Sequence, residues 1–158
     1  MPGRYLLDTN TASYIIKGNV PAVRHRLVKV PMSQVAISTV TEGELRYGVA
    51  RRPDATQLQT TVNEFLLRLT ILPWDSEAAQ RYGQLRAALE REGRVMGNLD
   101  MMIGAQALAS DLVLVTNDQA FKRIKKLKIE DWTSRKRSKR QATEPDGYRI
   151  AIRSGRVR

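Results

Sequence analysis

The sequence predicts a parallel α/β sandwich. Short apolar segments alternate along the chain with helical patterns, as in folds where helices cover a parallel sheet. The segment 112–116 is apolar almost throughout, which is typical of a central parallel strand buried on both faces. Two apolar segments run directly into polar turns, Asp8-Thr9-Asn10 and Thr116-Asn117-Asp118. Ligands of open α/β sheets bind just beyond the carboxyl ends of strands, so these turns could share one site.

The first half of the chain contains two strand-turn-helix units. Gly18 suits the left-handed residue that closes a helix, and Pro53 stops the second helix. Thr39 or Thr41 is expected to cap that second helix. The predicted elements are a strand at 4–7, a helix at 11–17, a strand at 35–38 and a helix to about residue 52.

The second half continues the alternation. Apolar residues recur every three or four positions between 55 and 69, which indicates an amphipathic helix, and Asp75 or Ser76 can cap another that ends at Gly93. The helix at 99–110 is apolar on nearly every side, with Asp100 as its one charge. The other predicted elements are a strand at 70–72, a strand at 112–116, a helix at 120–127 and an edge strand at 128–130.

Composition excludes several kinds of chemistry. The chain has no Cys and one His, His25, so disulfides, thiolate nucleophiles and two-histidine acid/base catalysis are closed to it. No apolar run approaches the roughly 20 residues that span a bilayer, and the expected location is the cytoplasm. His25 is expected to be an ordinary surface residue, and Trp74 and Trp132 to be packing residues.

The net charge of +11 is concentrated at the C-terminal end. We expect one domain over residues 1–132, followed by a basic, flexible extension over 133–158 that holds nine Lys or Arg and two Asp or Glu. A basic surface attracts nucleic-acid phosphates but does not specify a partner, and a solvated charged end is the plain alternative.

Each acid near the predicted sheet edge has an ordinary explanation. Asp8 and Asp118 could cap the helices that follow them, and Asp100 gains from a helix dipole. Glu44 could face solvent and pair with Arg51.

Their joint placement is harder to explain as capping. All four acids could project toward one end of the sheet, and two carboxylates about 4 Å apart repel by about 4 kcal/mol at an effective dielectric near 20. Convergence therefore implies a bound cation, and oxygen ligands without His or Cys favour Mg²⁺ or Mn²⁺.

Five segments, in order, resemble those of PIN-domain ribonucleases of the VapC toxin type. They cover most of residues 4–132 and read LLDTN (6–10), ISTVTEGELRYG (37–48), GRVMGNLDMMIGAQALA (93–109), LVTND (114–118) and IEDW (129–132). The resemblance implies a three-layer α/β/α sandwich with a mainly parallel central sheet. It also implies a homodimeric, Mg²⁺-dependent endoribonuclease inhibited by a cognate VapB-like antitoxin; in the most similar branch the substrate is the anticodon stem-loop of initiator tRNA.

The resemblance also assigns roles to individual residues. The catalytic and metal-binding acids would be Asp8, Glu44, Asp100 and Asp118, with Asp8 and Asp100 as the main ligands. Thr9, Asn10, Thr116 and Asn117 would orient the acids or waters, although turn formation explains these four equally well. The expected products carry 5′-phosphate and 3′-hydroxyl ends.

Three alternatives stay open. A haloacid-type phosphatase needs a second Asp two residues after the first, where this chain has Asn10. A phosphoacceptor signalling domain needs an adjacent acidic pair and a late lysine, neither of which is convincingly placed. A catalytically inactive RNA-binding module would keep the basic surface and bind RNA without cutting it.

Overall fold

The computed structural model describes residues 4–134, and their central feature is a parallel sheet with the strand order β3-β2-β1-β4-β5. Every neighbouring pair in it is parallel, so the predicted parallel α/β class is confirmed. The strands are β1 (Tyr5–Leu7), β2 (Val35–Ser38), β3 (Thr70–Leu72), β4 (Val113–Val115) and β5 (Ile129–Glu130). The helices are α1 (Thr9–Lys17), α2 (Pro21–Leu27), α3 (Thr39–Ala50), α4 (Thr56–Arg68), α5 (Ser76–Arg91) and α6 (Asn98–Ala109), with short 3₁₀ turns η1 (Met32–Gln34) and η2 (Gln119–Arg123).

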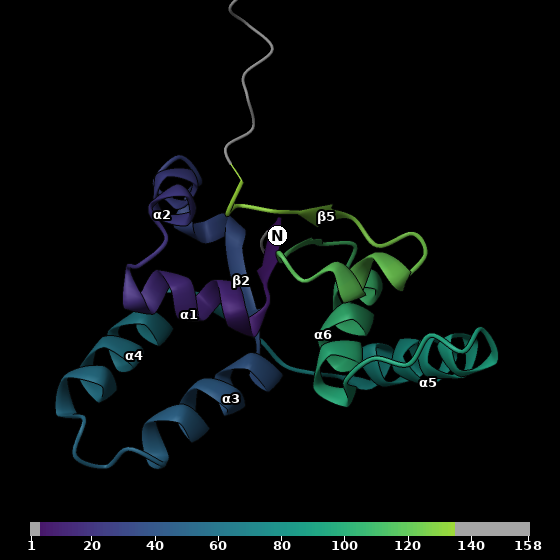
Figure 1. Cartoon of the computed structure of the whole chain (residues 1–158), viewed down its shortest axis with the longest axis horizontal. Helices are drawn as coiled ribbons and strands as arrows, with labels where there is room; N and C mark the ends of the chain where they lie inside the picture. Colours follow the sequence, from purple (N-terminus) through teal and green to yellow (C-terminus); the bar gives the residue numbers. More distant parts are fainter. Residues whose placement is uncertain (1–3, 135–158) are drawn as a thin grey trace, which may run out of the picture.

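Helices cover both faces of this sheet, which makes three layers (Figure 1). Side chains of successive strand residues point to opposite faces. Tyr5 and Leu7 therefore pack under α1, α2 and α4, while Leu6 packs under α5 and α6. Strands β1 and β2 are buried throughout, as their apolar sequences indicate, whereas the edge strands β3 and β5 are partly exposed.

The register of the strands brings three polar residues to one edge. Leu7 pairs with Ile37 in β2 and with Val115 in β4. The next residues along the chain are Asp8, Ser38 and Thr116, all buried. The polar turns predicted at the carboxyl edge are therefore neighbours in space.

Most helix ends follow the sequence signals. Asp8 caps α1 and Asp75 caps α5, and Gly18 closes α1 with a φ of 64°. The expected cap of α3 was wrong, because Ser38 rather than Thr39 or Thr41 accepts the hydrogen bond, from the Val40 N–H. The last strand residue itself starts the helix.

The prediction of a helix at 120–127 is wrong. Only the 3₁₀ turn η2 forms, because Phe121 and Ile124 are drawn into the core beneath α6 and Lys126 adopts a left-handed φ of 66°. Helix α2 was not predicted, since its short segment carries no strong apolar period.

The two tryptophans are packing residues, as predicted. Trp132 is buried with its ring 5.4 Å from that of Tyr5, and Trp74 packs against Tyr82 and donates to the Met102 carbonyl. His25 is exposed on α2. The extension predicted at 133–158 lies, from residue 135 on, outside the described residues.

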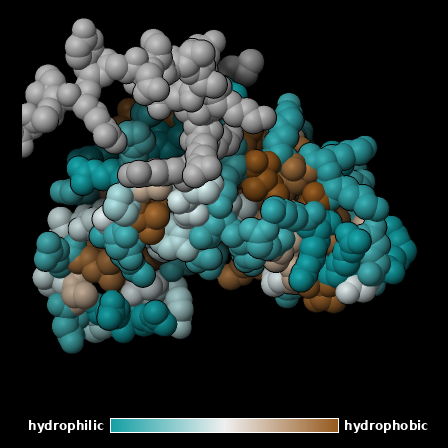
Figure 2. All heavy atoms as spheres, turned by 45° about the horizontal axis from the view of Figure 1, so that its top comes forward, coloured by the Kyte–Doolittle hydropathy of each residue, from teal (hydrophilic) through white to brown (hydrophobic). Residues whose placement is uncertain are grey.

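The surface is largely hydrophilic, with separate apolar patches on the face shown in Figure 2. The exposed large apolar side chains are Val28, Met32, Tyr47, Leu67, Val95 and Leu99. Among the described residues, no helix combines the length and apolar character needed to cross a membrane.

The packing of α6 on η2 gives a stability test at Gly104. A Cβ at this position would lie 2.6 Å from Ile124 Cδ1. We expect Gly104→Ala to lower the free energy of unfolding by about 1–3 kcal/mol, the usual effect of overpacking. Ile124→Val removes the clashing methyl group, so the double variant should lose less stability than the two single changes added together, as measured by urea unfolding.

Gly83→Ala is the matched control in α5. A Cβ there meets nothing within 4 Å, and alanine should raise the stability by up to about 1 kcal/mol through helix propensity. Equal effects at the two glycines would contradict close packing of α6 on η2.

Candidate active site

Asp8 is the most buried of the four acids, at 3% exposure. One carboxylate oxygen accepts a hydrogen bond of 2.8 Å from the Thr11 N–H, and the other accepts one of 2.5 Å from the Thr116 hydroxyl. Burial raises the pKa of Asp8, the hydrogen bonds from Thr116 and Thr11 lower it, and the charge of Asp118 raises it; the net direction is upward. The Asp8 carboxylate is therefore oriented, but its charge is poorly solvated.

The Thr116 hydroxyl connects Asp8 to Asp118. It donates to the Asp8 carboxylate and accepts from the Asp118 N–H at 3.0 Å. The Asp118 side chain accepts a hydrogen bond from the Ala120 N–H, so it caps η2, which is the ordinary explanation given above for this acid. This capping does not remove Asp118 from the site, because its charge acts on both Asp8 and Asp100.

Glu44 is held by the turn after β1. The Thr9 hydroxyl donates to Glu44 Oε1 at 2.8 Å, across 35 residues of sequence. The ordinary explanation for Glu44, a surface pair with Arg51, is not what forms. Arg51 instead lies over the ring of Tyr47, and Arg46 pairs with Glu42. Glu44 thus faces the site and Glu42 does not.

Asp100 lies in the first turn of α6 and interacts electrostatically with the other three acids. Its pKa is raised first by burial and then by the charges of Asp118, Glu44 and Asp8. These three charges come from turns and helices far apart in the sequence. The four predicted acids therefore share one electrostatic neighbourhood at the carboxyl edge of the sheet.

The predicted orienting residues divide into two pairs. Thr9 and Thr116 hydrogen-bond to the acids, whereas Asn117 donates to Tyr14 and Asn10 is exposed.

Thr11 was missed by the sequence reasoning. Its N–H holds Asp8 and its hydroxyl donates to the Val115 carbonyl, which ties α1 to β4. The signal was available, since a capping Asp takes its hydrogen bond from the residue two or three positions later.

The acid side chains suit a hard divalent cation. All four are carboxylates, the ligands that Mg²⁺ and Mn²⁺ prefer, and burial and mutual repulsion already disfavour charge on Asp8 and Asp100. As they stand, residues 4–134 contain no group of three or more Asp, Glu or His side chains arranged to hold a metal ion.

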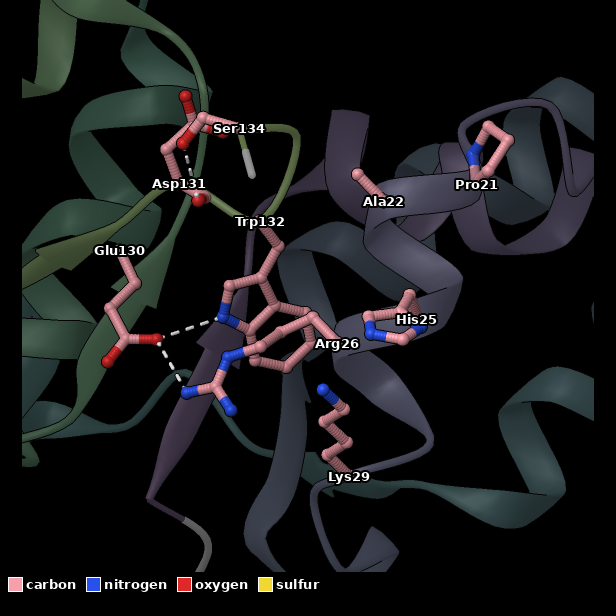
Figure 3. A pocket seen from close by; sticks show the side chains of 9 residues that line it. All are labelled: Pro21, Ala22, His25, Arg26, Lys29, Glu130, Asp131, Trp132 and Ser134. Atoms are coloured by element: carbon pink, nitrogen blue, oxygen red, sulfur yellow. Dashed lines mark hydrogen bonds and ion pairs between the residues drawn. The ribbon is translucent and has the colours of Figure 1, made fainter. Parts of the chain in front are cut away.

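A separate cavity lies away from the acids. It has a volume of about 630 Å³ between α2 and the segment after β5, and it contains none of the four acids (Figure 3). Arg26 and the Trp132 indole both reach Glu130 in its wall. A smaller groove of about 280 Å³ is lined by Thr9 and Glu44, and so adjoins the acids.

Comparison with known proteins agrees with this fold. Residues 5–127 match the family described as PIN domain. The chain is 38% identical over 130 residues to a tRNA(fMet)-specific endonuclease VapC of Salmonella typhimurium, covering 82% of this chain and 98% of that protein. It is 36% identical over 130 residues to Ribonuclease VapC2 of Rickettsia felis, covering 81% and 97%. The solved structure of DNA-bound VapBC from Salmonella typhimurium has a TM-score of 0.77 at 37% identity, covering 82% and 98%.

The fold and the relatives together define the class of protein, which is a nuclease that hydrolyses phosphodiester bonds. The chain belongs to the PIN-domain family, among its VapC ribonucleases. The predicted three-layer PIN-like architecture is thereby confirmed.

The repulsion among the acids predicts a pH-dependent stability difference at Asp100. Because its pKa is raised in the folded state, the native protein binds more protons than the unfolded chain as pH falls toward that pKa, and stability rises on acidification. Asp100→Asn removes the charge, so in EDTA at neutral pH it should melt about 1–3 °C above the parent protein. The gap should close as the pH falls through the raised pKa, where Asp100 itself is protonated.

Glu64→Gln is the control, because Glu64 is an exposed acid on α4. It should leave the melting curve unchanged across the same pH range. A constant offset between Asp100→Asn and the parent at all pH values would mean that charge repulsion is not the cause.

Proposed function

We propose that the protein is an Mg²⁺-dependent endoribonuclease that acts as the toxin of a toxin–antitoxin pair. The observation that carries the proposal is the electrostatic contact of Asp100 with Asp118, Glu44 and Asp8 at one edge of the sheet. Such a cluster of partly buried carboxylates is stabilised by a bound cation. Mg²⁺ is the proposed ion, and Mn²⁺ could replace it.

The four carboxylates have distinct roles in this proposal. Asp8 and Asp100 would be the main ligands, with Glu44 and Asp118 completing the site directly or through water. When bound, the cation would supply Lewis-acid activation of the attacking water and would neutralise charge on the phosphodiester. The Thr116 hydroxyl and the Thr11 N–H keep the Asp8 carboxylate oriented, and Thr9 does the same for Glu44.

The proposed substrate is tRNA, with the anticodon stem-loop of initiator tRNA as the first candidate. The support is the 38% identity to a protein named tRNA(fMet)-specific endonuclease, over almost its whole length. Hydrolysis is proposed to leave 5′-phosphate and 3′-hydroxyl ends, and such a substrate places the activity in the cytoplasm.

The proposed partners are a VapB-like antitoxin and a second copy of this chain. The solved neighbours of Salmonella typhimurium and Rickettsia felis are VapBC complexes, at 37% and 36% identity. The homodimer stays a prediction from the family resemblance.

Replacing Asp8 tests the catalytic proposal. Asp8→Asn keeps an oxygen that can accept from Thr11 but removes the charge that the cation needs. We expect a folded variant whose cleavage of tRNA in Mg²⁺ is reduced by about a thousandfold or more. Gel analysis of tRNA incubated with protein in Mg²⁺, and in parallel in EDTA, measures this.

Glu77→Gln, an exposed acid in the first turn of α5, is the control and should cut normally. Unchanged Mg²⁺-dependent cleavage by Asp8→Asn would refute the assignment. Retention of tRNA without cleavage by the parent protein, in both Mg²⁺ and EDTA, would instead indicate the non-catalytic binding module.

Thr116→Val tests the hydroxyl that joins Asp8 to Asp118. The change preserves shape and removes one donor and one acceptor. Groups that orient metal ligands typically contribute ten- to a hundredfold, so cleavage should fall by about that factor and the Mg²⁺ concentration for half-maximal rate should rise. Thr60→Val, at an exposed position of α4, should change neither quantity.

A further inference from the structure

A groove between α1, α3 and α4 leads away from the acids. Its walls include Thr9 and Glu44 as well as Tyr47, Arg51 and Arg52. Positions 44, 47 and 48 recur at three- and four-residue spacing, so they share one face of α3, and Arg51 and Arg52 directly follow its last residue. Arg51 lies seven residues beyond Glu44, about 10 Å along the helix axis, and slightly past the end of α3. A ligand in this groove would therefore run into the acid site.

The charges that line the groove suit a polyanion. Lys17, Arg51 and Arg52 are its basic residues, and Glu44 is its one acid. Within residues 4–134, none of these three cations forms an ion pair. Other basic residues, such as Arg46 and Lys125, are paired with neighbouring acids. The groove thus holds uncompensated positive charge beside the acid cluster.

Tyr47 adds an exposed aromatic ring to this basic wall. Its side chain is 66% exposed, and the Arg51 guanidinium lies 5.6 Å from the ring centre. The exposed ring and the guanidinium beside it are therefore accessible to a ligand in the groove. Aromatic rings and guanidinium planes are the surfaces on which unpaired RNA bases stack.

We propose that Tyr47 and Arg51 bind the nucleotide next to the scissile phosphodiester, the ring stacking on its base, with Lys17 and Arg52 contacting the neighbouring phosphates. The inference rests on the proposed ribonuclease function and names the residues that position its substrate. Unpaired nucleotides of an RNA loop fit this groove, because stacking requires a base that is free of its own helix. The groove also has an apolar floor, so a protein segment is the competing occupant, and the test separates the two.

The test measures both cleavage and binding. The binding probe is a fluorescein-labelled anticodon stem-loop of initiator tRNA, titrated by anisotropy with protein that also carries Asp8→Asn to prevent cleavage. Tyr47→Leu keeps an apolar side chain but loses the ring, and should weaken binding about tenfold, while Tyr47→Phe restores it. Arg51→Ala should weaken binding, and Arg52→Ala, which removes a proposed phosphate contact, should also reduce the slope of log K against log[salt] by about one.

In the cleavage assay, where Asp8 is intact, Tyr47→Leu should raise KM about tenfold and leave kcat nearly unchanged, since it removes binding and no catalytic group. Arg46→Ala is the matched control, because Arg46 is an exposed arginine of the same helix that pairs with Glu42 and does not line the groove. It should bind and cleave like the parent. Melting curves of all variants check that the exposed substitutions leave the fold intact.

Two outcomes overturn the inference separately from the function. If the parent cleaves the RNA and Tyr47→Leu and Arg51→Ala both act like Arg46→Ala, the RNA assignment of the groove fails and the protein segment is left as the competing occupant, while the nuclease proposal stands. If the parent binds the stem-loop and the variants bind it weakly, but no protein cleaves it in Mg²⁺, the groove assignment stands and the catalytic proposal fails. Absence of both binding and cleavage in the parent overturns both.

Discussion

The buried carboxylate of Asp8 is the constraint on which the site depends. It sits where β1 ends, between two parallel neighbours, and its hydrogen bonds from Thr11 and Thr116 join α1 to β4 at that edge. The Asp8 N–H donates to the Val115 carbonyl, which continues the strand pairing up to the acid itself. A buried charge is costly unless it is hydrogen-bonded or neutralised. The protein supplies hydrogen bonds to Asp8, and a bound cation would neutralise the charge that remains.

The incompletely neutralised charge of Asp8 lowers the stability of the free folded protein and favours the binding of a cation. Asp100 brings a second poorly solvated carboxylate to the same edge from a helix that is otherwise apolar. Packing and helix capping do not require a charge at either position, since an amide could fit there with less electrostatic cost. Any cation that binds the folded protein alone stabilises it by mass action. The poorly solvated charges of Asp8 and Asp100 are thus the ones that the proposed chemistry uses.

Much of this could be predicted from the sequence, and the failures have local causes. The apolar strands and the polar turns that follow Leu7 and Val115 were enough to predict the parallel sheet. They also predicted the edge where the acids lie, because parallel strands all end on the same side. Ser38 as the cap of α3 and the short turn η2 depend on tertiary packing. The link from Thr9 to Glu44 spans 35 residues and required the structure.

In the proposed function, helix α3 carries both a catalytic acid, Glu44, and a substrate-binding residue, Tyr47. Ser38, at the end of β2, caps this helix, so its direction follows from the sheet. Its inner surface is anchored by buried Thr41 and Leu45, which leaves Glu44 free to turn toward Thr9. Tyr47 lies about one turn beyond Glu44 on the same side of the helix, so it forms part of the wall of the groove. A substrate bound as proposed against this face would therefore be set in register with the acids by the helix itself.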